Sequence, residues 1–196
     1  KYWFDKFDIA AWWDQKIEEL SKGMAQKVQF IVTVLHQPKL LIFDEPFSGF
    51  DPINAQLIAK EILQLRDEGA TIIFSTHRME SVEEMCDYIA LIDKSNKIID
   101  GKLDDIKRQY RTNTFQIGLK TSDSKEIETV LKQQFEVTQT DFRMLNEGYT
   151  ANVKIPENES PNGLISLLTK HGDLQHFLEL VPSANDIFIQ AVHKNS

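Results

Sequence analysis

An α/β protein in two parts is the fold class that this sequence predicts, because of the order of its helix-like and strand-like segments. Helix and strand patterns alternate over the first 100 residues, which is typical of a covered, mostly parallel sheet. From residue 112 the order becomes strand, helix, strand, strand, helix, strand, which is that of a small ferredoxin-like α+β domain. We therefore expect one domain over residues 1–111 and a second domain over residues 112–196.

Capping residues and apolar periodicity define the elements of the first domain. A short helix is expected over residues 9–19, and Ser21 suits the N-cap of a longer helix that ends at Pro38. The apolar residues of that helix fall on one face: Met24, Val28, Ile31, Val32 and Leu35. Asp51 and Pro52 open another helix, in which we expect five buried side chains: Ile53, Leu57, Ile58, Ile62 and Leu65. Buried strands are expected at residues 40–44 and 70–75, a helix at 80–87, and two strands at 88–92 and 97–100.

The second domain is expected to contain short strands and three helices. The strands are predicted at residues 114–119, 136–141, 142–145, 149–155 and 173–181. The helices are predicted at residues 123–135, 164–171 and 183–193, and a turn at residues 146–148. The strand at 142–145 and the last helix are additions to the ferredoxin-like order.

Composition excludes several classes of protein. The formal net charge of −8 argues against a nucleic-acid-binding face, which needs clustered Lys and Arg. A single cysteine, Cys86, excludes an intramolecular disulfide and a multi-cysteine zinc site, which suits a reducing cytosol. No apolar run approaches 18 residues, so we expect no membrane-spanning helix.

Two adjacent acids end the first buried strand and give the clearest chemical signal. Leu40 to Phe43 are apolar, Asp44 and Glu45 follow, and Pro46 stops the strand. Strands of this kind deliver side chains to the carboxyl edge of a parallel sheet, where ligands of open α/β folds bind. One carboxylate there can hold Mg²⁺ near phosphates, and its neighbour can polarise an attacking water.

Four motifs occur in a fixed order around these acids. Leu20-Ser21-Lys22-Gly23-Met24 opens a helix, Asp44-Glu45 ends a strand, Ser48-Gly49-Phe50-Asp51 follows, and Ser75-Thr76-His77 ends the next strand. Taken together, the motifs resemble the second half of an ATP-binding-cassette (ABC) ATPase. The resemblance covers roughly residues 1–105. It identifies the four motifs, in order, as the signature motif, the Walker B strand, the D-loop and the switch histidine.

The resemblance implies a role for each candidate residue. Ser21, Lys22 and Gly23 would grip the γ-phosphate of ATP bound to an opposite subunit, which agrees with the positive end of a helix dipole. Asp44 would help to hold Mg²⁺, and Glu45 would orient or deprotonate the attacking water. The two remaining residues complete the site, since His77 would contact the γ-phosphate and Asp51 would report across the dimer interface while capping its own helix.

The sequence departs from the family pattern in two ways. The common signature is Leu-Ser-Gly-Gly-Gln, whereas Lys22 and Met24 replace a Gly and the Gln here, a variant similar to exporter-type ATPases with a small C-terminal domain. No Gly-x-x-x-x-Gly-Lys-Ser/Thr loop and no glutamine loop is found, and Lys1 stands where an initiator Met would be. We therefore expect a C-terminal portion of a longer protein, which alone neither binds ATP tightly nor turns it over.

The resemblance implies the ATPase subunit of an exporter, with ATP and Mg²⁺ as cofactors. The expected partners are membrane-spanning permease subunits and a second ATPase subunit, with no nucleic acid, and the expected location is cytoplasmic, peripheral on the inner face of the cell membrane. One alternative is half of an SMC-type or repair ATPase, which would need long heptad repeats before the signature. The other is a non-catalytic regulatory module, against which the presence of Glu45 and His77 argues mildly.

Overall fold

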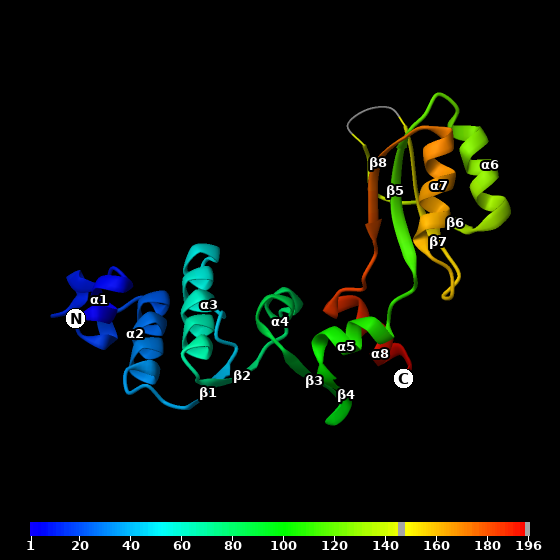
Figure 1. Cartoon of the computed structure of the whole chain (residues 1–196). Coiled ribbons are helices and arrows are strands. Elements are labelled where there is room, and N and C mark those ends of the chain that lie inside the picture. Colours follow the sequence, from blue (N-terminus) through cyan, green and yellow to red (C-terminus); the bar gives the residue numbers. More distant parts are fainter. Residues whose placement is uncertain (145–147, 195–196) are drawn as a thin grey trace. The chain divides into compact units, whose positions relative to one another are not determined.

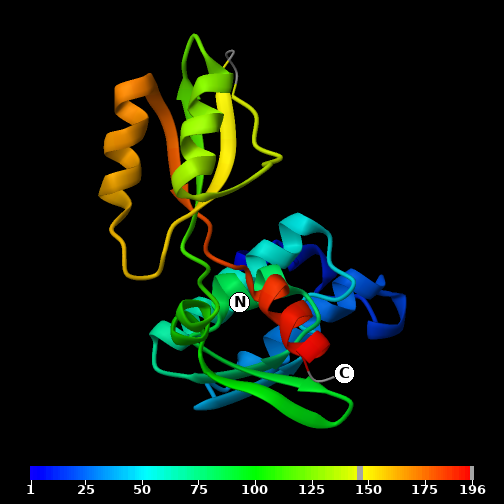
Figure 2. The same cartoon turned by 90° about the vertical axis from the view of Figure 1, so that its right-hand side faces the viewer.

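The computed structural model describes residues 1–144 and 148–194, and the chain divides into two compact units, Lys1–Met85 and Cys86–Ser196 (Figures 1 and 2). Each unit is described by itself. The boundary predicted at residue 111 follows the change in the order of elements along the sequence, and it stays a prediction.

Helices make up most of the first unit. Its elements are α1 (Tyr2–Lys6), the 3₁₀ turns η1 (Ala10–Trp12) and η2 (Ile17–Glu19), α2 (Lys22–Val34), β1 (Leu40–Asp44), α3 (Pro52–Asp67), β2 (Thr71–Ser75) and α4 (Met79–Met85). The single helix predicted over residues 9–19 is wrong. Two isolated 3₁₀ turns stand there, because the region lacks the continuous apolar stripe that stabilises a longer helix.

The two long helices of this unit begin at the predicted residues. Ser21 Oγ accepts a hydrogen bond from the Met24 N–H at 3.3 Å, and Asp51 caps α3, with Pro52 in its first turn. The predicted buried faces are partly wrong. Val32 is 63% exposed and Ile53 is 80% exposed, whereas the core takes Phe30, Ile31 and Val34 from α2 and Ile58 and Ile62 from α3.

Strands β1 and β2 pair in parallel, with Leu40 opposite Thr71 and Asp44 opposite Ser75. Their inner face packs on the helices through Leu41, Phe43, Ile72 and Phe74. The outer face is apolar and exposed at Leu40, Ile42 and Ile73. The strands predicted to be buried are therefore covered on one face only.

The second unit begins with a hairpin. Strands β3 (Tyr88–Asp93) and β4 (Asn96–Lys102) pair in antiparallel fashion and form their own two-stranded sheet. The short helix α5 (Leu103–Gln109), which the sequence analysis did not predict, follows β4. The C-terminal helix α8 (Ala184–Lys194) returns to β4, and Leu103, Ile106, Ala184, Ile187 and Ala191 are buried.

The rest of the second unit has the predicted ferredoxin-like order. The elements are β5 (Thr114–Lys120), α6 (Ser124–Gln134), β6 (Glu136–Thr138), β7 (Tyr149–Lys154), α7 (Pro161–His171) and β8 (Asp173–Glu179). They form an antiparallel sheet of order β6-β7-β5-β8, and α6 and α7 lie on one face of it (Figures 1 and 2). Ile117, Leu119, Ile127, Leu131 and Leu168 are completely buried between these helices and the sheet.

The segment after β6 differs from the prediction. Phe142 to Met144 form no strand, and the remainder of the predicted strand and most of the turn at residues 146–148 lie outside the described residues. In the part of the chain that the structure describes, no helix is both long enough and apolar enough to cross a bilayer.

Candidate functional site

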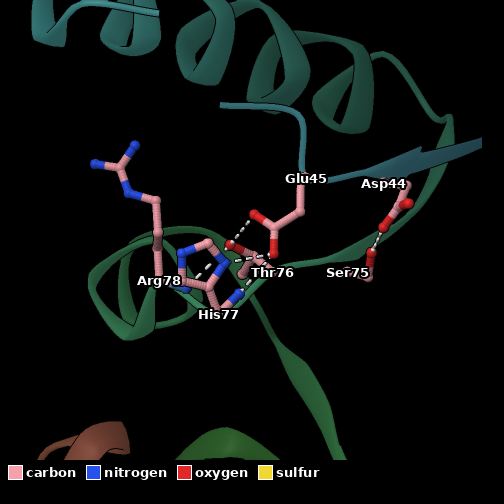
Figure 3. A network of polar contacts seen from close by, with 6 residues as sticks. All are labelled: Asp44, Glu45, Ser75, Thr76, His77 and Arg78. Atoms are coloured by element: carbon pink, nitrogen blue, oxygen red, sulfur yellow. Dashed lines mark hydrogen bonds and ion pairs between the residues drawn. The ribbon is translucent and has the colours of Figure 1, made fainter. Parts of the chain in front are cut away.

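Five of the polar residues singled out in the sequence lie at one edge of the β1–β2 sheet: Asp44, Glu45, Ser75, Thr76 and His77. Because the two strands are parallel and Asp44 is opposite Ser75, their carboxyl ends meet there. Glu45 directly follows β1, and Thr76 and His77 directly follow β2 (Figure 3).

The backbone turns sharply at Glu45. Its φ of +45° lies in the left-handed region, which few residues other than glycine adopt, and its N–H still donates to the Ser75 carbonyl oxygen at 3.0 Å. Strained backbone of this kind costs on the order of 1–3 kcal/mol and is common at functional sites. Here the turn directs the Glu45 carboxylate toward the residues that follow β2 (Figure 3).

Three donors from the end of β2 hold the Glu45 carboxylate. Oε1 accepts from the His77 backbone N–H at 3.0 Å and lies 2.7 Å from His77 Nδ1, while Oε2 accepts from Thr76 Oγ1 at 3.3 Å. The hydrogen bond from the His77 side chain is the main reason that the pKa of Glu45 falls below its usual value. Glu45 is therefore ionised at neutral pH and able to accept a proton.

His77 is oriented by this contact but is otherwise open to solvent. Its side chain is 82% exposed, and Nδ1 faces Glu45. When Nδ1–H donates to the carboxylate, Nε2 remains at the outer side of the ring, where it accepts a hydrogen bond when neutral and donates one when protonated. The arrangement can present one imidazole nitrogen to a ligand at this edge.

Asp44 lies beside this pair but has a different partner, since it accepts a hydrogen bond from the Ser75 hydroxyl (Figure 3). Mg²⁺ prefers carboxylate oxygens, keeps several of its waters and is commonly held by one or two protein carboxylates together with substrate phosphates. Asp44 fits that requirement. Among the described residues no group of three or more His, Cys, Asp or Glu could enclose a metal ion by itself.

The residues predicted to grip phosphate lie at the N-terminus of α2. Ser21 caps the helix, and a Cβ added at Gly23 would meet no atom within 4 Å, so the backbone there is open to a ligand. In the part of the chain described, no hydrogen bond or ion pair joins Ser21, Lys22 or Gly23 to the Glu45–His77 pair. The candidate residues therefore form two separate sets, one at the edge of the β1–β2 sheet and one at the start of α2.

Asp51 serves as a cap. Its Oδ1 accepts from the backbone N–H groups of Ile53 and Asn54, each at 3.0 Å, and Oδ2 accepts from Asn54 Nδ2 at 2.5 Å. These bonds, chiefly the one from the Asn54 backbone, lower the pKa of Asp51. The carboxylate is ionised and held at the end of the loop that follows Glu45.

Ser75 and Thr76 contact the two acids directly, although the sequence analysis placed them in the His77 motif without a role. Ser75 donates to Asp44 and Thr76 to Glu45, and Thr76 Oγ1 also accepts from the Arg78 N–H at 3.1 Å. In the sequence, only the positions of Ser75 and Thr76 indicate these contacts. Hydroxyl residues at the end of one strand face acids at the end of the neighbouring parallel strand.

Comparison with known proteins matches a family model within each unit. Residues 101–192 match the family described as "ATP-binding protein DrrA1-3-like, C-terminal domain", and residues 14–83 match "AAA domain, putative AbiEii toxin, Type IV TA system". An ABC transporter ATP-binding protein of Alkalihalophilus pseudofirmus is 34% identical over 98% of this chain and 68% of its own length. Another from Bacillus subtilis is 35% identical over 97% of this chain and 61% of its own length.

A solved structure supports the fold. The ATP-binding subunit of an ABC transporter superposes with a TM-score of 0.52 and 32% sequence identity, over 56% of this chain and 45% of that chain. The fold is that of an α/β protein of the P-loop NTPase class. This chain belongs to the ABC ATPase family, among the ABC transporter ATP-binding proteins. It spans between three fifths and about two thirds of the two curated relatives described above.

Proposed function

We propose that this chain is the catalytic and C-terminal part of an ABC transporter subunit that hydrolyses ATP to drive export. The observation that carries the proposal is the Glu45 carboxylate, fixed by His77 and Thr76 at the sheet edge beside Asp44. The relatives' names support a transporter over an SMC-type machine or a regulatory module. The DrrA1-3-like C-terminal domain supports the exporter type that Lys22 in the signature also suggests.

Glu45 is the proposed general base. Oε1 is occupied by His77, whereas Oε2 has one longer bond from Thr76 and can also accept a proton from water. The oxygen of that water attacks the γ-phosphorus of ATP, the bond to the β–γ bridging oxygen breaks, and ADP and phosphate are released. His77 holds the γ-phosphate side of the site through its outward-facing Nε2.

Asp44 is the proposed ligand of Mg²⁺, which would neutralise charge on the β- and γ-phosphates when bound. Ser75 keeps this carboxylate apart from Glu45 by donating to it. Ser21, Lys22 and Gly23 are proposed to bind the γ-phosphate of ATP held by a second ATPase subunit, with unpaired N–H groups at the start of α2 as donors. Asp51 would then lie at the interface between the two subunits.

The remaining parts of the proposal concern the whole protein. Its partners are separate membrane-spanning permease subunits, and its place is the cytoplasmic face of the membrane. ATP closes the pair of ATPase subunits and hydrolysis reopens it, so that the reaction drives a conformational cycle in the permease. The transported substrate is set by the permease.

The test uses the complete gene product, with Mg-ATP hydrolysis as the readout. Glu45→Gln keeps the size of the side chain and removes the base, so we expect kcat to fall by about 10²–10⁴-fold. Glu84→Gln on α4 is the matched control, since Glu84 is exposed, and its rate should equal that of the wild type. Equal rates in both variants would rule out the proposed base.

A further inference from the structure

Gln26, which the motif analysis left without a role, joins α2 to the loop after Glu45. Its Nε2 donates to the Ser48 carbonyl oxygen, 22 residues further along the chain. The amide orientation is fixed by this partner, because the reverse orientation would place two acceptor oxygens against each other. The side chain that lies one turn into the signature helix is therefore bonded to the D-loop.

The bond continues to the proposed catalytic residue. The Ser48 N–H donates to the Glu45 carbonyl oxygen at 3.0 Å, so Ser48 accepts from Gln26 on one side and donates to Glu45 on the other. One residue thus separates the α2 side chain from the backbone of the proposed base. These two bonds connect α2 to the turn at Glu45.

Gly49 completes the contact, because a residue with a side chain would be strained at its position. Its φ is +83°, and an added Cβ would lie 2.9 Å from Gln26 Oε1 and 3.1 Å from Lys22 Cε. Lys22 and Gln26 are four residues apart on α2 and therefore lie on the same face. The methylene stem of Lys22, the residue that replaces a signature Gly, thus packs on the D-loop.

One feature of the contact favours its release. In the part of the chain that the structure describes, Gln26 Oε1 is buried without a hydrogen-bond partner. A buried acceptor of this kind is unfavourable and gains a partner when water reaches it. The contact is consequently easier to open than a fully paired one of the same size.

We propose that Lys22, Gln26, Ser48 and Gly49, here named the loop contact, are positioning residues that couple the phosphate-binding end of α2 to Glu45. The inference rests on the proposed function. Because Ser21 and Glu45 would serve two different ATP molecules in the dimer, a coupling between them makes hydrolysis at one site depend on occupancy of the other. Lys22 contributes through its stem as well as through its charge.

The first measurement uses this chain itself and needs no nucleotide. Gln26→Met removes the hydrogen bond and the unpaired acceptor while it keeps the length of the side chain, and Gln29→Met on exposed α2 surface is the matched control. In Gln26→Met, but not in Gln29→Met, we expect the rate of amide hydrogen exchange at Ser48, measured by NMR, to rise roughly fivefold. A rise of this size corresponds to the loss of one net hydrogen bond. Lys22→Ala should give a smaller increase and Lys22→Met none, because methionine keeps the stem. Unchanged exchange in Gln26→Met would overturn the loop contact.

The second measurement uses the complete gene product and follows ATP hydrolysis against ATP concentration. We expect Gln26→Met to lower kcat and bring the Hill coefficient toward one, with less change in KM, whereas Gln29→Met keeps the wild-type values. If Gln26 has only a structural role, the Hill coefficient of Gln26→Met will equal that of the wild type. That result would contradict the coupling. An inactive wild-type protein would instead contradict the proposed function, and the exchange experiment would still decide whether the loop contact exists.

Discussion

The β1–β2 sheet of the first unit and the four-stranded sheet of the second differ in how completely they are covered. On β5, Phe115, Ile117 and Leu119 are buried beneath α6 and α7. On the outer face of β1 and β2, Ile42 is 68% exposed and Ile73 is 54% exposed. Apolar side chains that gather on an exposed sheet face are typical of a surface that packs against a further part of a fold.

The difference separates the part of the chain with a closed core from the part that carries the candidate catalytic residues. The ferredoxin-like sheet has a closed core, and its described strands do not end in an acidic pair. The smaller parallel sheet is incompletely covered, yet it carries Asp44, Glu45 and His77 at one edge. Catalytic residues are often built on less stable elements, because strain and exposed polar groups oppose folding while they serve the reaction.

Separating the two units gives the largest expected effect. Residues 86–196 expressed alone should unfold cooperatively, since their two sheets and buried core remain together. Residues 1–85 alone should bind a hydrophobic dye and aggregate through the outer face of β1 and β2. Circular dichroism and dye fluorescence check both results. A well-folded, dye-free fragment 1–85 would contradict the comparison.

Single substitutions test the same difference between a covered and an exposed sheet. Leu131→Ala on α6 removes a completely buried side chain, so we expect the free energy of unfolding of the second unit to fall by about 2–5 kcal/mol. Ile42→Ala on β1 should change the stability of the first unit by less than about 0.5 kcal/mol, because the side chain is already exposed.

The two effects can be followed separately in one denaturation experiment. All three tryptophans, Trp3, Trp12 and Trp13, lie in the first unit, so their fluorescence reports that unit, and circular dichroism reports both. A large loss from Ile42→Ala would mean that the outer face of β1 is already part of a core.

A much smaller effect than that of Leu131→Ala is expected for the pH dependence of the Glu45–His77 pair. The pKa of Glu45 is depressed below its ordinary value of 4.5 in the folded chain, chiefly by the hydrogen bond from His77. The contribution to stability is therefore complete above pH 4.5 and is lost as the pH falls through the folded pKa. Since the Glu45 side chain is about a third exposed, we expect the contribution to stay below about 1 kcal/mol.

Titration of the Glu45 carboxyl carbon by NMR measures this effect directly. The midpoint should lie below 4.5 in the wild type and should rise in His77→Ala, which removes the hydrogen bond that chiefly lowers the pKa. A midpoint that does not move in His77→Ala would mean that the two side chains do not interact in solution.

Local signals in the sequence predicted most elements and the candidate residues. Ser21 and Asp51 fixed two helix starts because a cap acts within three residues, and Asp44 and Glu45 marked a strand end. The order of strands and helices in the ferredoxin-like part followed from the alternation of strand-like and helix-like patterns in the sequence. Helix α5 was missed because it spans only seven residues, too short for a clear apolar period.

Properties that depend on tertiary packing could not be predicted. The exposure of Val32 and Ile53 depends on which side of α2 and α3 meets the core, which periodicity alone does not decide when apolar residues surround the helix. Likewise, Gln26 is an ordinary helical residue in the sequence, and its bond to Ser48 appears only when the loop is in place.

The proposed catalytic site belongs to the first unit, and two histidines test this assignment most directly. His77 contacts Glu45 in the first unit, whereas His176 on β8 is bonded to Gln116 at 3.2 Å and stacks on Phe142 in the second. The measurement is Mg-ATP hydrolysis by the complete gene product carrying either His77→Ala or His176→Ala. We predict a loss of about 10²-fold or more for His77→Ala and a rate within about twofold of the wild type for His176→Ala. Unchanged hydrolysis in His77→Ala, or a comparable loss in His176→Ala, would contradict a catalytic site in the first unit.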